Sequence, residues 1–377
     1  MAKTKSVYAF EEADSKKRML LGGKGAGLSE MTRLKLPVPP GFIITTEVCN
    51  KYYDNNKKLP KDVMPAVMKN ITIMEKKTGK KWNSTKNPLL VSVRSGAAIS
   101  MPGMMDTILN LGLNEKTVEG FAEQTKNPRF SWDSYRRFIQ LFGKVVFGVN
   151  DEKFDHVLDS AKTKQGVTDD SKLSVESLKT IVSEYKKICE AHTKRKFPDS
   201  PIEQLELSIK AVFKSWMGER AIVYREKNGI TKDIANGTAV NVVTMVFGNM
   251  GDDCATGVVF TRNGHNGKKE IEGEYLINAQ GEDVVAGVRT GKNIELLKKD
   301  MPKSYKELTD ACTKLEKHYK EPQDIEFTIE QGKFYLLQTR TAKMSAGALV
   351  KISVDMVKEK LIDKNRALTR IPAQQLE

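Results

Sequence analysis

The sequence predicts a mixed α/β (α+β) fold that is larger than a single packed unit. Its 377 residues are too many for one ordinary hydrophobic core. Short apolar strands, Gly-rich turns and helices alternate over residues 1–112, whereas residues 113–200 carry helical periodicity and few strand signals. After Gly218 the chain returns to strand-rich sequence. We therefore expect α/β sequence on both sides of a helical insertion.

The elements follow from local patterns. Residues 41–45 and 89–93 are short, apolar and preceded by proline, which predicts buried strands. One apolar stripe predicts an amphipathic helix within the insertion: Tyr135, Phe138, Ile139, Phe142, Val145 and Val146. Ser200, Pro201 and Glu203 suggest a capping box that opens the next helix. Further strands are expected at 238–247, 257–261, 270–278 and 325–338, with helices at 305–319 and 346–361.

Composition excludes several classes of protein. Hydrophobic residues at 39% and charged residues at 29% are typical of a folded, water-soluble chain. No apolar run approaches the roughly 20 residues of a membrane helix, and no apolar core follows the first lysines. We therefore expect a cytoplasmic protein with no membrane partner, an organelle such as a plastid or microbody being the alternative.

The net charge of +14 raises the question of a nucleic-acid partner. The lysines alternate with acids along the predicted helices and no nucleic-acid-binding motif is present, so we expect a solvated basic surface and no nucleic acid. The four cysteines and four histidines are scattered, without metal-ligand or disulfide spacing. Catalysis centred on a Cys or His of this chain is therefore not expected.

Three segments carry residues suited to phosphate chemistry. The first is the Gly-rich run 22–27, whose backbone could approach phosphate oxygens beside Lys24; a plain tight turn is the alternative. The second is Arg94, at the end of a strand and before a loop of small residues. A guanidinium can hold phosphate with two hydrogen bonds, although an ordinary surface salt bridge would also explain it.

The third segment is a predicted hairpin. Two-residue spacing places Asp324 and Glu326 on one strand face, and Gln338 and Arg340 on one face of the next strand. A three-residue turn at 330–332 would put all four on a common face, with Ile329 opposite Lys333 and Asp324 opposite Gln338. Their oxygens suit Mg²⁺ held against phosphates, the alternative being a solvated face with an ion pair. Ile325, Phe327, Ile329 and Leu337 would face the core.

A fourth segment, 278–289, places Glu282 and Asp283 in a Gly-bounded turn. Acids there could accept hydrogen bonds from ribose hydroxyls, and a capped turn is the alternative.

Together these segments resemble one family, pyruvate, phosphate dikinase. The resemblance rests on residues 88–114, which contain Val-Arg-Ser-Gly and then Met-Pro-Gly-Met-Met-Asp-Thr, and on 21–25, 278–289, 324–328 and 337–340. Phosphoenolpyruvate synthases and other dikinases share the Val-Arg-Ser core but not its continuation. They remain the nearest enzyme alternative, and a nucleotide-binding or docking module without turnover is the alternative from another class.

The resemblance implies an ATP-grasp domain with ATP between two α/β lobes. Residues 1–112 and 201–243 would form the first lobe, 113–200 a helical insertion subdomain, 244–340 the second lobe and 341–377 a connector. Lys24, Arg94 and Arg340 would be catalytic, and Mg²⁺ would be held by Asp324, Glu326 and Gln338. The expected nucleotide-binding residues are Lys24, Arg94, Ser100, Met101, Gly103, Thr107, Val243, Met245, Glu282 and Arg340. A monovalent cation is a further cofactor candidate.

The family's half-reaction converts ATP and phosphate to AMP and pyrophosphate and leaves the β-phosphoryl on a histidine. That histidine follows Thr-Ser on a swivelling domain, and none of the four histidines here does so. We therefore expect the chain to need this domain as its partner, and to be monomeric by itself although the full-length enzyme would be a homodimer. The family usually has Gln at the position of Val243, which puts one adenine contact in doubt.

Overall fold

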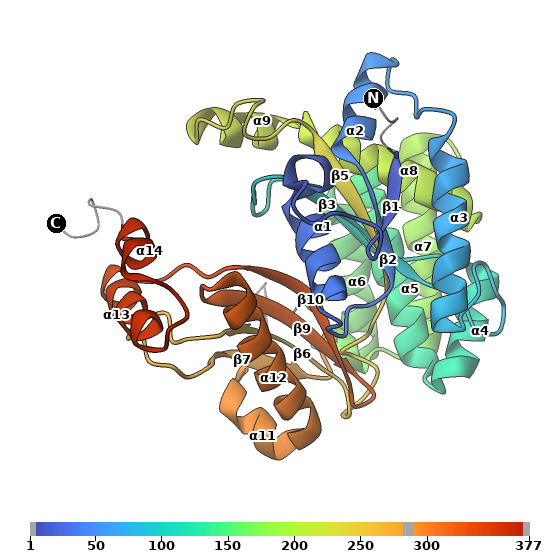
Figure 1. The fold of residues 1–377 in the computed structure, drawn as a ribbon. Coiled ribbons are helices and arrows are strands. Elements are labelled where there is room, and N and C mark those ends of the chain that lie inside the picture. Colours follow the sequence, from blue (N-terminus) through green and yellow to red (C-terminus); the bar gives the residue numbers. More distant parts are fainter. Residues whose placement is uncertain (1–4, 282, 284–289, 372–377) are drawn as a thin grey trace. The chain divides into compact units, whose positions relative to one another are not determined.

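Two five-stranded antiparallel sheets form the framework of the protein (Figure 1). The computed structural model describes residues 5–281, 283 and 290–371. Each sheet belongs to its own compact unit, one comprising residues 1–30 and 40–245 and the other 31–39 and 246–377. The mixed fold class expected from the sequence is confirmed.

The first sheet has the order β1-β2-β5-β3-β4. Its strands are β1 (Val7–Ala9), β2 (Gly41–Ile44), β5 (Thr238–Thr244), β3 (Val91–Ala97) and β4 (Thr107–Leu111). The central strand β5 is buried along its whole length. It ends at Thr244, three residues before the end of the predicted range 238–247. A strand from the middle of the chain thus joins strands from its beginning.

Helices accompany this sheet: α1 (Arg18–Arg33), α2 (Thr46–Asp54), α3 (Val63–Thr78), α8 (Pro201–Trp216) and α9 (Glu219–Lys227). Proline occupies the first turn of α8 as predicted. The predicted capping box is wrong, because the Ser200 side chain accepts no hydrogen bond from the helix. Burial of one face of α8, which includes Leu205, Ile209 and Phe213, holds the helix in place without that cap.

Residues 113–200 are helical, as expected. They form α4 (Glu115–Thr125), α5 (Pro128–Phe147), α6 (Asp151–Gln165), a short 3₁₀ turn (Asp170–Lys172) and α7 (Val175–Thr193). The predicted stripe of α5 is buried at Tyr135, Phe138, Ile139 and Phe142. Asp133 of α5 is also buried and accepts a hydrogen bond from Arg136 Nε at 2.8 Å. These helices belong to the same compact unit as the first sheet.

The second sheet has the order β10-β9-β6-β7-β8. Its strands are β10 (Lys333–Thr341), β9 (Gln323–Glu330), β6 (Ala255–Phe260), β7 (Glu272–Ile277) and β8 (Lys292–Asn293). A 3₁₀ turn (Ile294–Leu296), α11 (Leu297–Asp300) and α12 (Pro302–Tyr319) follow, and α12 packs against β9 and β10. The predicted helix at 305–319 is therefore confirmed.

The predicted connector forms α13 (Ala346–Lys358) and α14 (Lys364–Thr369). The fully buried Arg262 donates from Nη2 to Glu316 of α12 and to Glu359, which follows α13, each at 2.8 Å. A small apolar cluster formed by Ala348, Ile352, Met356 and Ile362 lies beneath the two helices. The connector is thus packed onto the second unit.

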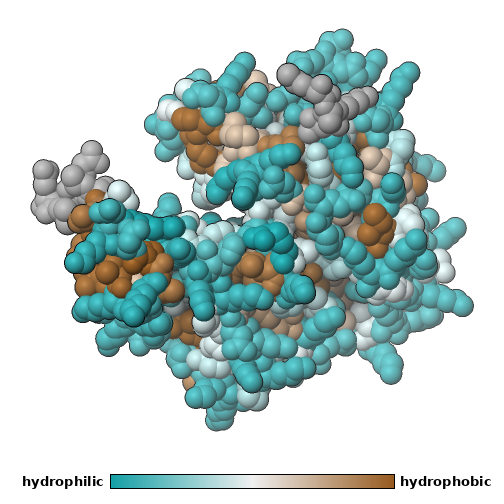
Figure 2. Space-filling view, in the orientation of Figure 1, coloured by the Kyte–Doolittle hydropathy of each residue, from teal (hydrophilic) through white to brown (hydrophobic). Residues whose placement is uncertain are grey.

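Hydrophobic residues also gather on the outside of α13 and α14 (Figure 2), where Val354 and Leu368 are exposed.

Within the part of the chain that the structure describes, every helix is too short or too polar to cross a bilayer.

Candidate functional site

The Gly-rich run of α1 contains one sharp break. Gly22 has φ +71° and ψ 162°, so the helix stops there and restarts just before Lys24. A Cβ at Gly22 would lie 1.8 Å from the carbonyl oxygen of Gly96, so only glycine fits. The Gly-rich run 22–27 is therefore not one continuous turn, since Gly23, Gly25 and Gly27 are helical. A helix that restarts at this point directs its first-turn N–H groups along its axis, an arrangement that suits an anion.

The restarted part of α1 lies against the sheet face that carries Arg94. Cross-strand pairing aligns Ile43 of β2, Asn241 of β5, Arg94 of β3 and Thr107 of β4 in one row. A Cβ at Gly25 would lie 2.9 Å from Asn241 Oδ1 and 3.0 Å from Ile43, so α1 approaches this row closely. The structure thus brings the segments of Lys24, Arg94 and Thr107 together on one face of the first sheet.

The loop of small residues predicted after Arg94 lies between β3 and β4. Arg18 at the start of α1 donates from Nε to the carbonyl oxygen of Ala98 at 2.8 Å, which ties the loop base to the helix. Met101 is buried, whereas Ser100 and Gly103 are exposed. Burial raises the pKa of the Asp106 carboxyl in the loop, although Arg220 and Lys144 act in the opposite direction.

Val243 and Met245, both expected to bind the nucleotide, lie near the end of β5 and directly after it. Val243 is buried and pairs with Gly41 and Ser92, and the N–H of Met245 donates to Leu90 at 2.9 Å. The Met245 N–H is therefore occupied within the first unit. The predicted ribose residue, Glu282, lies outside the described residues.

The hairpin of β9 and β10 carries the predicted metal residues, and its register differs from the prediction. The turn has two residues, Gln331 and Gly332, with φ of +49° and +71°, as in a type I′ turn. Glu330 therefore pairs with Lys333, and the predicted pairing of Ile329 with Lys333 is wrong.

A β-bulge at Leu337 then restores the parity that the shorter turn removes. Beyond the bulge, Asp324 lies opposite Arg340 and Glu326 lies opposite Gln338, so the predicted pairing of Asp324 with Gln338 is wrong. The four side chains nevertheless share one face, as predicted, because directly paired residues point to the same side. Leu337 is only partly buried in the bulge, contrary to expectation, while Phe334 and Leu336 enter the core.

This face combines anionic, neutral and cationic groups. Arg340 Nε donates to Asp324 Oδ2 at 2.6 Å; the Asp324 side chain is nearly buried and that of Arg340 is 47% exposed. Across the described ranges no cluster of three or more Asp, Glu, His or Cys side chains could hold a metal ion. Two carboxylates beside one carboxamide nevertheless fit Mg²⁺, which commonly takes one or two protein carboxylates and completes its octahedron with phosphate and water.

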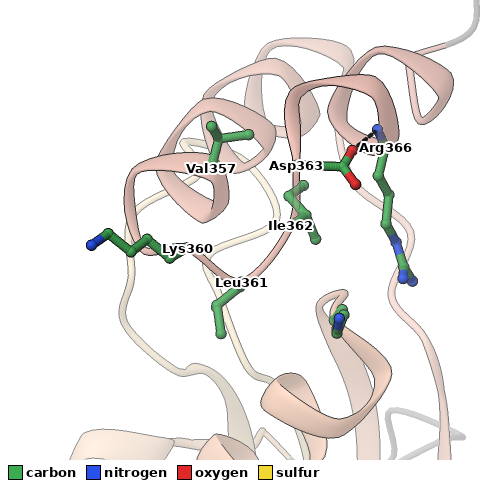
Figure 3. Close-up of a pocket in the computed structure, with 7 residues that line it drawn as sticks. Val357, Lys360, Leu361, Ile362, Asp363 and Arg366 are labelled. Carbon is green, nitrogen blue, oxygen red and sulfur yellow. Dashed lines mark hydrogen bonds between the residues drawn. The ribbon is translucent and has the colours of Figure 1, made fainter.

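Two other features do not contribute to this chemistry. A cavity of about 380 Å³ in the second unit lies between α12, α13 and α14 and contains none of the predicted site residues (Figure 3). There Asp363 accepts a hydrogen bond from the backbone N–H of Arg366 at 2.7 Å. All four cysteines are buried and none forms a disulfide, and burial raises the pKa of Cys189 to about 12.

The predicted residues thus form two groups. Arg94 and Thr107 lie on the first sheet and Lys24 on α1 beside it, and Asp324, Glu326, Gln338 and Arg340 lie on the second sheet. Asn241, which lies between Arg94 and the Gly-rich run, was missed. A polar residue in the middle of an otherwise apolar and β-branched strand is the signal that could have identified it.

The chain is similar to known proteins over nearly its whole length. The family model described as "Pyruvate phosphate dikinase, AMP/ATP-binding domain" matches residues 18–64, 55–304 and 297–361. The chain is 53% identical over 373 residues to the pyruvate, phosphate dikinase of Entamoeba histolytica, covering 98% of this chain and 42% of the relative. It is 52% identical to that of Clostridium symbiosum, covering 99% of this chain and 43% of the relative. Identity to the chloroplastic enzyme of Arabidopsis thaliana is 46%, with 99% and 39% covered. The chain therefore spans less than half the length of these relatives.

Proposed function

The chain belongs to the family of pyruvate phosphate dikinase AMP/ATP-binding domains, and from this premise we propose that it supplies the ATP-side half-reaction of such an enzyme. It binds ATP with Mg²⁺ and inorganic phosphate, and it promotes transfer of the β-phosphoryl group to a histidine of a separate domain. AMP and pyrophosphate are the products. The whole enzyme would use the phosphohistidine to interconvert pyruvate and phosphoenolpyruvate.

The first sheet supports phosphate binding. Lys24 follows the helix break at Gly22, and Arg94 lies on the sheet face against which that helix packs. We assign both residues to phosphate oxygens, and the loop of residues 100–107 to covering them. An ammonium and a guanidinium stay charged at neutral pH and donate strong hydrogen bonds to phosphate, so their role is to orient it and to stabilise its charge.

The hairpin supports a metal role, and it is the observation that carries the proposal. The carboxylates of Asp324 and Glu326 and the carboxamide of Gln338 lie on one face of the hairpin. Arg340 lies beside Asp324 and donates a hydrogen bond to it. When bound, Mg²⁺ would neutralise phosphate charge. Arg340 would stabilise charge on the transferring phosphoryl group, and positioning with electrostatics accounts for most of the rate enhancement in such transfers.

Calorimetric titration with a non-hydrolysable ATP analogue, with and without Mg²⁺, tests the proposal. The wild-type chain should bind the analogue more tightly with Mg²⁺, and the Asp324→Asn/Glu326→Gln variant should lose that dependence. Asp310→Asn/Glu270→Gln removes the same charge from two exposed positions of the same unit and should behave like wild type. Absence of nucleotide binding by the folded chain would contradict the nucleotide assignment. Binding that depends on Mg²⁺ in the Asp324→Asn/Glu326→Gln variant as well would contradict the metal assignment.

A further inference from the structure

Asn241 is a buried polar residue in a strand whose neighbouring residues are apolar. It lies in the middle of β5, the central strand of the first sheet, and its side chain is fully buried. Its neighbours along the strand are Val240 and Val242, which suit a strand, whereas Asn is disfavoured there. The Oδ1 atom has no hydrogen-bond partner among the described residues. A buried acceptor without a donor destabilises a fold, so its presence requires another explanation.

The amide of Asn241 fills a narrow space between two backbone segments. A Cβ at Gly96 of β3 would lie 2.5 Å from Nδ2, and a Cβ at Gly25 of α1 would lie 2.9 Å from Oδ1. Any larger residue at either glycine would therefore displace the amide. Two glycines and one amide thus set the spacing between α1 and β3.

These two segments carry the residues that we assign to phosphate. Asn241 pairs directly with Arg94 across β5 and β3, and its Nδ2 donates to the Arg94 carbonyl at 3.4 Å. Lys24 precedes Gly25, and its Cβ lies 3.5 Å from the position that a Gly96 Cβ would take. The Asn241 side chain therefore touches the backbone that carries each of the two cations.

We propose that Asn241 is a positioning residue that sets the spacing between Lys24 and Arg94 for phosphate binding. Its amide keeps the restarted helix of α1 at the correct distance from β3 and directs both cationic side chains toward the same phosphates. The unpartnered Oδ1 lowers stability in exchange for that geometry, as is common at functional sites. This inference rests on the proposed nucleotide site.

The test compares Asn241→Val with Asn241→Thr, two substitutions of nearly equal shape that differ by one hydroxyl group. Binding of ATP and of adenosine is measured by calorimetry, and the thermal midpoint of each variant is recorded. For Asn241→Val we expect an unchanged or higher midpoint, because the substitution removes a buried acceptor and adds a β-branched residue. Affinity for ATP should fall about tenfold, the scale of one charge-assisted hydrogen bond, while affinity for adenosine stays the same. Asn241→Thr also lacks the amide that fills the space between α1 and β3, so its affinity for ATP should fall to a similar extent.

Ser208→Ala is the matched control. Ser208 lies on α8, which also packs against β3 and β5, and its buried Oγ has no partner among the described residues. Its removal should leave both affinities unchanged. Wild-type affinity of either Asn241 variant for ATP would overturn the inference, as would equal losses of affinity for ATP and adenosine. If the wild-type chain bound no ATP, the proposed function itself would fail, so the two failures are distinguishable.

Discussion

Arg340 and Asp324 form the closest charged contact of the candidate metal face, yet the contact contributes little to folding. The Arg340 side chain is 47% exposed, and ion pairs with so much solvent contact are worth about 0–1 kcal/mol. Side-chain spacing predicted that the two residues share a face, but the sequence could not show that they pair directly. That pairing depends on the bulge at Leu337, which no local sequence motif predicts.

The substitution Arg340→Ala should therefore separate binding from stability. We expect the free energy of unfolding to change by less than about 1 kcal/mol, and the affinity for Mg-ATP to fall about tenfold through loss of one charge-assisted phosphate contact. Urea denaturation and calorimetric titration measure the two quantities. Lys343→Ala removes a nearby exposed positive charge and should change neither. A large loss of stability without loss of affinity would show that Arg340 is structural.

At the scale of the element, the hairpin and α1 show which parts of a pattern can be predicted. The hydrophobic alternation of β9 correctly placed Ile325, Phe327 and Ile329 in the core, because burial of one face fixes the side that each residue takes. The turn length was wrong, because a two-residue turn with a bulge gives the same parity as a three-residue turn. In α1 the glycines predicted a turn, but only Gly22 leaves the helical conformation, and the others allow close packing on the sheet.

Gly22 tests the importance of that close packing. We expect Gly22→Ala to lower the free energy of unfolding by more than Gly79→Ala, although both glycines have φ near +70°. A Cβ at Gly79 meets nothing within 4 Å, so that variant bears only the backbone strain of about 1–2 kcal/mol. A Cβ at Gly22 would also collide with Gly96, and ATP binding should be lost or reduced because α1 must move. Equal destabilisation of the two variants in urea denaturation would argue against the close approach of Gly22 to Gly96.

At the scale of the whole molecule, the sequence predicted the changes of composition but not the strand order. The helical character of residues 113–200 could be predicted from local sequence, since α5 has a clear apolar stripe and the residues around it carry few strand signals. The position of β5 between β2 and β3 could not, because it depends on pairing between segments about 150 to 200 residues apart. Each unit has its own sheet and its own buried ion pair, which allows their stabilities to be examined separately.

We expect the two units to unfold in distinguishable transitions, each sensitive to its own buried ion pair. Asp133→Asn leaves Arg136 of the first unit without its closest carboxylate, and Glu316→Gln removes one of the two carboxylates that contact Arg262 of the second unit. In both cases a second carboxylate remains nearby, Asp170 or Glu359, so we expect a loss of about 3 kcal/mol, the lower end for breaking a buried pair. Calorimetric scans should show each variant lowering one transition and not the other. If both variants lowered a single common transition equally, the two units would unfold as one.

The acid dependence of the first transition follows from Asp133. Burial opposes its charge, but Arg136 and Arg137 outweigh that effect and lower the pKa from 3.8 to about 2. Because the folded pKa lies below the unfolded one, the stabilisation by Asp133 is complete well above pH 3.8 and is lost as the pH falls from 3.8 toward 2. The difference in unfolding free energy between wild type and Asp133→Asn should therefore be smaller at about pH 3 than at about pH 6. The Asn side chain does not titrate, so any pH dependence of this difference in unfolding free energy comes from Asp133. A difference that stayed constant between these pH values would mean that folding does not change the pKa of Asp133. The buried ion pair would then not be the source of the stabilisation.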